Sequence, residues 1–156
     1  MTPTFLLPLA AAALATLSAL PAAAHGDVTP QAVDTHELPA LGADWRAENP
    51  YRRNDQAIRI GASAYGQNCA RCHGLDAVSG GIAPDLRRID NECAAQKDDK
   101  KKSACAKDTD EYFSSTVRKG RSRNGAVYMP PFEGVLSQEA VWAIKSWLET
   151  RREKPL

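Results

Sequence analysis

The sequence predicts an all-α domain with long irregular loops. Three segments, beginning near residues 54, 109 and 137, repeat apolar residues at helical spacing. No stretch of strand length alternates apolar and polar residues. The loops are long for so few helices, which indicates that a large apolar cofactor fills part of the interior.

The first 24 residues form an apolar leader. The run from Phe5 to Leu20 carries no charge and is too short to span a bilayer comfortably. Pro21 breaks the run, and Ala22 and Ala24 supply the small residues that precede a signal-peptidase cut. We expect cleavage after Ala24 and export to the periplasm; a retained membrane anchor is the alternative, since the leader lacks Lys and Arg.

The remaining chain is predicted to be one small domain, residues 54–156, preceded by an extended arm, residues 25–53. The arm is rich in proline and polar residues and shows no apolar periodicity. The 20 basic and 19 acidic residues nearly balance, which argues against a nucleic-acid partner. No later apolar run is long enough to cross a membrane, so we expect a soluble protein. We also expect it to be a monomer.

The first helix of the domain begins at Asn54 or Asp55, because either side chain can cap the free amides of a first turn. Ile58 and Tyr65 belong to its apolar face. Gly61 lies inside this helix although glycine lowers helix stability by about 1 kcal/mol. A close helix crossing would explain a glycine at this position.

The motif that carries chemistry is Cys69-Ala70-Arg71-Cys72-His73, a C-x-x-C-H sequence. On a helical turn, positions i, i+3 and i+4 share one face, so Cys69, Cys72 and His73 point together. Two thiols can then add to the two vinyl groups of a haem while the imidazole reaches its iron. The motif predicts one covalently bound haem c, and the export signal agrees with attachment outside the cytoplasm.

Two other uses of these cysteines are less favoured. A zinc site could recruit Cys93 and Cys105, but zinc ribbons need a second close pair, which these two do not form. A thioredoxin-like dithiol needs a βαβ setting, for which the sequence gives no sign.

Pro84 is predicted to orient His73. It lies in Gly80-Gly81-Ile82-Ala83-Pro84-Asp85-Leu86, where a short helical turn could start. Its carbonyl oxygen can accept the Nδ1 hydrogen of His73, which leaves Nε2 for the iron. An ordinary proline at the first position of a helix is the alternative, and both roles can hold together.

Cys93 and Cys105 enclose a charged stretch that has too few apolar residues to anchor itself by burial. In an oxidising compartment they should form a disulfide, which would stabilise this insertion, residues 93–105, by about 3 kcal/mol. Lys97 and the lysines at 100–102 are interpreted as a solvated surface, with partner docking as the alternative.

Two further helices follow. Thr109 or Asp110 can cap the second, which runs to Gly120 after a basic pair. Ser137 can cap the third, whose apolar residues keep helical spacing to Leu148.

Met129 is the predicted sixth ligand of the iron, chosen by elimination. The other candidates after the leader are His25 and His36, which lie in the arm. Pro130 and Pro131 stiffen the backbone after Met129, and a stiff loop can hold a thioether against the metal. The alternative is that Met129 packs in the core.

These features resemble class I cytochromes c, over roughly residues 54–152. The likeness implies a fold of three main helices, short helical turns and long loops around one haem, with Gly61 and Tyr65 facing residues 142–148. The segments around Gly61, Gly80 and Arg123 are similar to c-550-type cytochromes, and the paired cysteines fit that subgroup. What the resemblance implies is a carrier that accepts electrons from a quinoprotein alcohol dehydrogenase, which depends on pyrroloquinoline quinone.

We therefore predict a one-electron carrier and not an enzyme, because two axial ligands fill both free positions of the iron. A terminal oxidase or another cytochrome would be the acceptor. Partner contact is expected near Cys72, with Arg71, Arg121 and Arg123 available to steer an acidic face. The rival classes are a haem enzyme or gas-binding protein with an open sixth site, and a permanent subunit of a larger oxidoreductase.

Overall fold

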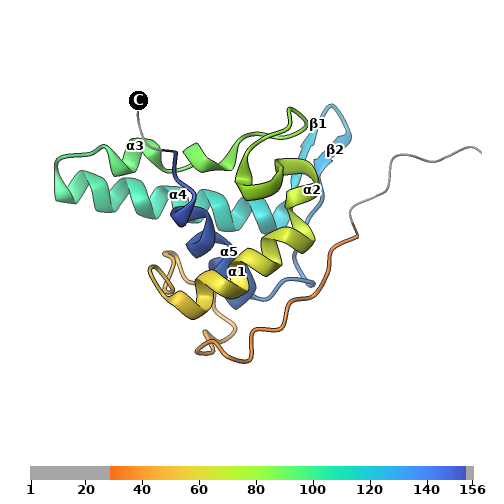
Figure 1. Ribbon diagram of the computed structural model, residues 1–156, viewed down its shortest axis with the longest axis horizontal. Coiled ribbons are helices and arrows are strands. Elements are labelled where there is room, and N and C mark those ends of the chain that lie inside the picture. Colours follow the sequence, from red (N-terminus) through yellow and green to blue (C-terminus); the bar gives the residue numbers. More distant parts are fainter. Residues whose placement is uncertain (1–28, 154–156) are drawn as a thin grey trace, which may run out of the picture.

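The computed structural model describes residues 29–153, and α-helices dominate this part of the chain (Figure 1). No helix within it is long and apolar enough to cross a membrane. The predicted leader, residues 1–24, lies outside the described residues. The helices are α1 (Asp55–Asn68), α2 (Ala70–His73), α3 (Asn91–Ala94), α4 (Asp99–Lys119) and α5 (Gln138–Thr150), with 3₁₀ turns η1 (Leu75–Ala77) and η2 (Leu86–Arg88).

Helices α1 and α5 cross closely. Asn54 caps α1, and Ser137 caps α5; each side chain accepts a hydrogen bond from an amide in the first turn, at 2.9 and 3.1 Å. The two backbones meet at Gly61, where an added Cβ would overlap the carbonyl oxygen of Ala143. The close crossing predicted from Gly61 is confirmed.

Most of the core is contributed by α5. Trp142 is fully buried, and Tyr65 of α1 packs on Trp147 with ring centroids 4.4 Å apart. The expected contact between Tyr65 and residues 142–148 is therefore confirmed. Helix α4 adds Phe113 and Val117 to the same core.

Helix α4 is longer than predicted, and a start at Thr109 or Asp110 is wrong. The helix begins after Asp98, whose carboxylate accepts a hydrogen bond from the amide of Lys101 at 2.9 Å. Its buried residues all lie between Asp110 and Val117. The first half therefore has no apolar face that periodicity could detect. The insertion, residues 93–105, includes the end of α3 and the start of α4, which pack against each other (Figure 1).

A β-hairpin is the second departure from the prediction, because an all-α chain should contain no strands. Strands β1 (Arg121–Arg123) and β2 (Ala126–Met129) pair in antiparallel fashion. Asn124 and Gly125 connect them with φ of 50° and 78°, as a tight two-residue hairpin turn requires. The strands are exposed up to Met129, so they show no apolar alternation, and the Asn-Gly pair was the available signal.

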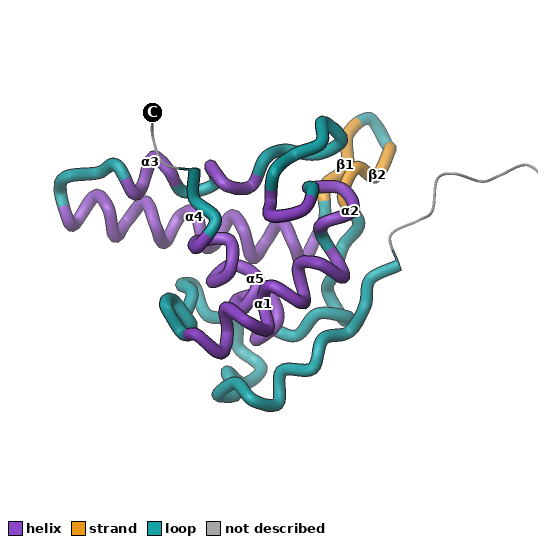
Figure 2. The backbone as a smooth tube through the Cα atoms, in the orientation of Figure 1, coloured by secondary structure: helices purple, strands orange, loops and turns teal. Residues whose placement is uncertain are grey.

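The described part of the N-terminal arm forms no helix or strand but packs along the domain (Figure 2). Leu38 and Tyr51 are buried in the common core. Gln138 of α5 makes three hydrogen bonds to the arm. Its amide oxygen accepts from the amide of Arg46 at 2.7 Å, and its amide nitrogen donates to the carbonyls of Asp44 at 3.0 Å and Gly42 at 3.3 Å. This part of the arm is fixed to the body of the molecule.

Candidate haem-binding site

The C-x-x-C-H segment forms one helical turn directly after α1. The amides of Cys72 and His73 donate to the carbonyl oxygen of Cys69, at 3.1 and 3.0 Å. This turn gives the three side chains the common face that their spacing predicted. Both thiols are free and half-buried, so neither is engaged in another covalent bond.

A backbone carbonyl orients the ring of His73. Its Nδ1 lies 2.9 Å from the carbonyl oxygen of Pro84. Since a carbonyl can only accept, the hydrogen lies on Nδ1, and the lone pair of Nε2 is left for a metal. Pro84 precedes Asp85, which caps η2, so Pro84 is not the first residue of that helical turn.

Tyr65, a core residue of α1, fixes the end of the C-x-x-C-H turn at Gly74. Gly74 ends α2 with φ of 82°, and a Cβ there would lie 2.8 Å from the carbonyl carbon of Val78. The hydroxyl of Tyr65 donates to the carbonyl oxygen of Gly74 at 2.8 Å. Burial raises the pKa of Tyr65, which keeps this hydroxyl protonated and able to donate. The packing of α1 on α5 thus also holds the motif.

The environment of Cys69 is unlike that of a redox-active thiol. Burial raises the pKa of Cys69 to about 12, and the neighbouring Cys72 acts in the same direction. A dithiol oxidoreductase needs a thiol of low pKa. The zinc alternative loses two ligands as well, because Cys93 and Cys105 form a disulfide.

Met129 is the last residue of β2 and packs, half-buried, against the core. The amide of Phe132 donates to the carbonyl of Val117 at 3.1 Å and so ties the following loop to α4. Gly120 has φ of 66°, and a Cβ there would lie 2.8 Å from the carbonyl carbon of Pro130. The backbone after Met129 therefore passes α4 at a distance that only glycine allows.

The residues present fit a haem. Helix α2 and the hairpin lie at the same end of the molecule (Figure 1). On segments beside the two candidate ligands, large apolar side chains are strongly exposed: Leu75 (79%), Ile82 (81%), Val127 (65%) and Tyr128 (71%). Burying such surface under a flat apolar group is favourable, at about 25 cal/mol per Å².

The other residues singled out in the sequence lie on the surface. Arg71, Arg121 and Arg123 are exposed, as are Lys97 and the lysines at 100–102. Their part in docking stays a prediction. His36 is exposed, with Nδ1 2.8 Å from Asp34, whereas His25 lies outside the described residues.

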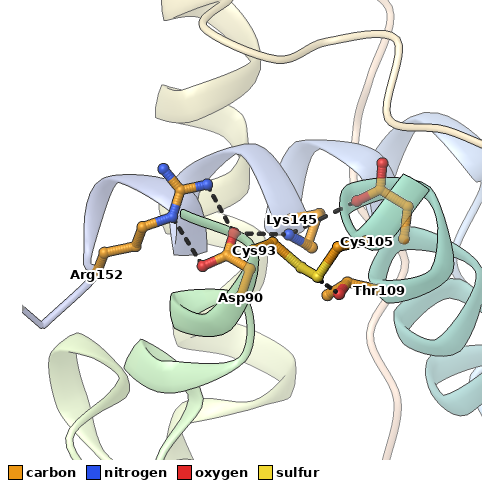
Figure 3. Close-up of a disulfide and its surroundings, with 7 residues drawn as sticks. Asp90, Cys93, Cys105, Thr109, Lys145 and Arg152 are labelled. Carbon is orange, nitrogen blue, oxygen red and sulfur yellow. Dashed lines mark hydrogen bonds and ion pairs between the residues drawn. A yellow bond between two sulfur atoms is a disulfide. The ribbon is translucent and has the colours of Figure 1, made fainter. Parts of the chain in front are cut away.

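The structure contains a buried ion cluster that the sequence does not predict (Figure 3). Lys145 is 1% exposed, and its Nζ lies 3.0 Å from Glu149, 3.4 Å from Asp90 and 3.7 Å from Asp110. Arg152 donates two hydrogen bonds to Asp90, both of 2.7 Å. The disulfide lies beside this cluster (Figure 3). Helical spacing puts Lys145 on the apolar face of α5, and its i, i+4 relation to Glu149 is the local sign of an ion pair.

Comparison with known proteins identifies the family. The family model described as cytochrome C oxidase, cbb3-type, subunit III matches residues 56–148. A cytochrome c550 from Pseudomonas aeruginosa is 53% identical over 133 residues, which cover 83% of this chain and 82% of the relative. The chain belongs to the cytochrome c family. As a member of this family it is an electron-transfer protein that carries covalently bound haem c.

Two other relatives of this cytochrome are named quinohemoprotein alcohol dehydrogenases, both from Pseudomonas putida. ADH IIB is 31% identical over 113 residues, which are 72% of this chain and 14% of the relative. ADH-IIG is 50% identical over 44 residues, which are 28% of this chain and 6% of the relative. The cytochrome thus corresponds to a small part of each of these proteins. No solved structure matches it significantly.

Proposed function

We propose that this cytochrome is a periplasmic one-electron carrier whose haem iron is held between His73 and Met129. The observation that carries the proposal is the C-x-x-C-H turn with the His73 ring fixed at 2.9 Å from the Pro84 carbonyl. Bound haem c supplies one-electron chemistry between the ferric and ferrous states of its iron. The predicted leader, residues 1–24, supports the periplasmic location.

Each residue has a separate task in this proposal. Cys69 and Cys72 form the two thioethers and fix the haem relative to α1. His73 offers Nε2, and its hydrogen bond to Pro84 makes the imidazole a stronger donor. Met129 would supply its thioether as the second protein ligand, which would raise the reduction potential. With two ligands from the chain, the bound haem would have no open position for a substrate, which favours a carrier over an enzyme.

We propose a quinoprotein alcohol dehydrogenase as the electron donor, and a terminal oxidase or another cytochrome as the acceptor. The support is that proteins named quinohemoprotein alcohol dehydrogenases contain a segment similar to this chain. In them a related segment is part of the same polypeptide as the rest of the enzyme.

The ligand assignment is tested by spectroscopy of the oxidised protein. We expect the weak near-infrared band of methionine-to-iron ligation in the unmodified protein and its loss in Met129→Ala. The ferrous form of Met129→Ala should bind carbon monoxide rapidly, whereas the unmodified protein should not. His36→Ala is the matched control and should keep the band. Rapid carbon monoxide binding by the unmodified protein would instead indicate an open sixth site.

The donor is tested by mixing the purified cytochrome with a reduced quinoprotein alcohol dehydrogenase and following the haem bands. We expect fast reduction by this enzyme and slow reduction by unrelated reduced dehydrogenases. Equally slow reduction by all of them would remove the proposed donor and leave the general carrier function. A native mass near that of one processed chain would argue against a permanent subunit.

A further inference from the structure

The loop after Met129 is tied to the C-terminal turn of α4 by three groups. The amides of Phe132 and Glu133 donate to the carbonyls of Val117 and Arg118, at 3.1 and 3.2 Å. The carboxylate of Glu133 also accepts from the guanidinium of Arg118, from Nε at 3.0 Å and from a terminal nitrogen. Any movement of the loop away from the core must therefore break contacts to Arg118.

The same guanidinium lies on an aromatic ring of the N-terminal arm. Cζ of Arg118 is 4.3 Å from the ring centroid of Trp45, within the range of a favourable cation–π contact. Trp45 is itself held on both sides, because Gln138 binds the carbonyl of Asp44 and the amide of Arg46. Arg118 thus joins a fixed segment of the arm to the loop of Met129.

We propose that Trp45 and Arg118 are positioning residues that hold Met129 against the haem iron. The inference rests on the proposed function, since it takes Met129 as the sixth ligand. An Arg–Glu pair at the surface contributes little by itself, and the side chains of Arg118 and Glu133 are 26% and 53% exposed. The stacking on Trp45 strengthens the pair, because it restricts the Arg118 guanidinium to one position. From that position the guanidinium binds Glu133 in the loop.

An external ligand measures how often the loop moves away. Imidazole can bind the ferric iron only in molecules in which the thioether has left, so its apparent affinity scales with the fraction of such molecules. Trp45→Leu removes the ring face while keeping apolar volume, and Arg118→Lys keeps the charge but removes the forked hydrogen bonds. Neither residue is placed at the haem.

The experiment is an imidazole titration of the oxidised, haem-loaded full chain. We expect each variant to bind imidazole about three- to tenfold more tightly than the unmodified protein, the range that one lost cation–π contact and its ion pair would give. Without imidazole, both variants should keep the near-infrared band. Because the two residues form one link, the double variant should bind little more tightly than either single variant.

The chain offers a matched control in Arg151→Lys. Arg151 also lies over a tryptophan, 5.1 Å from the ring centroid of Trp147, and pairs with a carboxylate, Asp76, at 3.5 Å. Among the described residues Arg151 makes no such link to the loop of Met129, so the Arg151→Lys variant should bind imidazole as the unmodified protein does.

Three results would overturn the inference, and they separate it from the proposed function. Unmodified imidazole affinity in both variants, with the band present, would refute the positioning role and leave Met129 as ligand. An equal shift in Arg151→Lys would show general loosening instead of a specific link. Absence of the band from the unmodified protein would overturn the ligand assignment and the inference with it.

Discussion

Helix α5 is held on its two sides by different forces. Toward α1, a glycine lets two backbones touch, and Tyr65 stacks on Trp147 at 4.4 Å. Toward α4, the buried ammonium of Lys145 lies among carboxylates, and a disulfide joins α3 to α4. The first contact depends on shape, whereas the second adds ion pairs to the apolar packing of Phe113 and Val117, and a covalent bond fixes α3 to α4.

The two contacts of α5 differ because α1 and α4 have different roles in the molecule. Helix α1 leads directly into the turn with Cys69, so the crossing with α5 sets the position of the candidate haem site. Helix α4 buries residues only between Asp110 and Val117, and its first half has no apolar face. A segment of this kind needs ionic and covalent attachment, because it has little apolar surface to bury.

The largest expected effect comes from breaking the charged side with Lys145→Met. The substitution removes the cation that Asp90 and Asp110 share and leaves each carboxylate with one guanidinium, that of Arg152 and that of Arg52. Oδ1 of Asp110 then has no cation near it, and it accepts no hydrogen bond from the described residues. Removing one partner from a buried ion pair costs about 3–5 kcal/mol. We expect a loss of this size in the free energy of unfolding, measured by urea titration of the holoprotein.

The control for that substitution is Lys107→Met, on the exposed surface of α4. It should change the free energy of unfolding by less than about 0.5 kcal/mol. If Lys145→Met also cost less than about 1 kcal/mol, charge would not be what attaches α4 to α5.

The next effect tests the apolar side with Gly61→Ala. The added methyl would overlap the carbonyl oxygen of Ala143 and lie 3.0 Å from the amide nitrogen of Ile144, so the helices must separate. Overpacking of this kind costs about 1–3 kcal/mol, and we expect the upper part of that range because the obstacle is backbone. The measurement is again urea unfolding.

Gly66→Ala is the matched substitution in the same helix. No atom lies within 4 Å of a Cβ at Gly66, so the variant should be more stable by up to about 1 kcal/mol, from helix propensity alone. Equal effects at Gly61 and Gly66 would mean that the crossing does not depend on close approach.

The same contrast explains what the sequence could predict. The α1–α5 pair, its caps Asn54 and Ser137 and the crossing at Gly61 follow from apolar periodicity and local capping rules, which describe local contacts. The spacing of the C-x-x-C-H motif likewise predicted the turn, because its geometry is contained within a few residues.

The features that the sequence did not predict depend on residues that are distant from one another in the chain. The first half of α4 has no apolar period, and Lys145 occupies a position that spacing assigns to the apolar face. Its carboxylates come from α4, α5 and the segment before α3, which no local pattern connects. The stacking of Arg118 on Trp45 joins the arm to α4 in the same way. Such contacts appear only in the folded chain.

The smallest expected effect is a dependence of stability on pH, which should affect the charged side of α5 and not the side that faces α1. Burial tends to raise the pKa of Asp90, but the hydrogen bonds from Arg152 and the charge of Lys145 outweigh it, and the pKa lies below its ordinary value of 3.8. A carboxylate with a lowered pKa in the folded state contributes stability that is complete above pH 3.8 and is lost as the pH falls through the folded value. Acid should therefore weaken the charged side first.

We expect the urea midpoint of the unmodified holoprotein to fall more steeply below this pH than that of Asp90→Asn, which cannot titrate at this position. Gly66→Ala keeps the whole cluster and should show the unmodified acid response at a higher overall stability. Parallel curves for Asp90→Asn and the unmodified protein would assign the acid sensitivity to other carboxylates. In that case the ion cluster would attach α4 to α5 without making the attachment depend on pH.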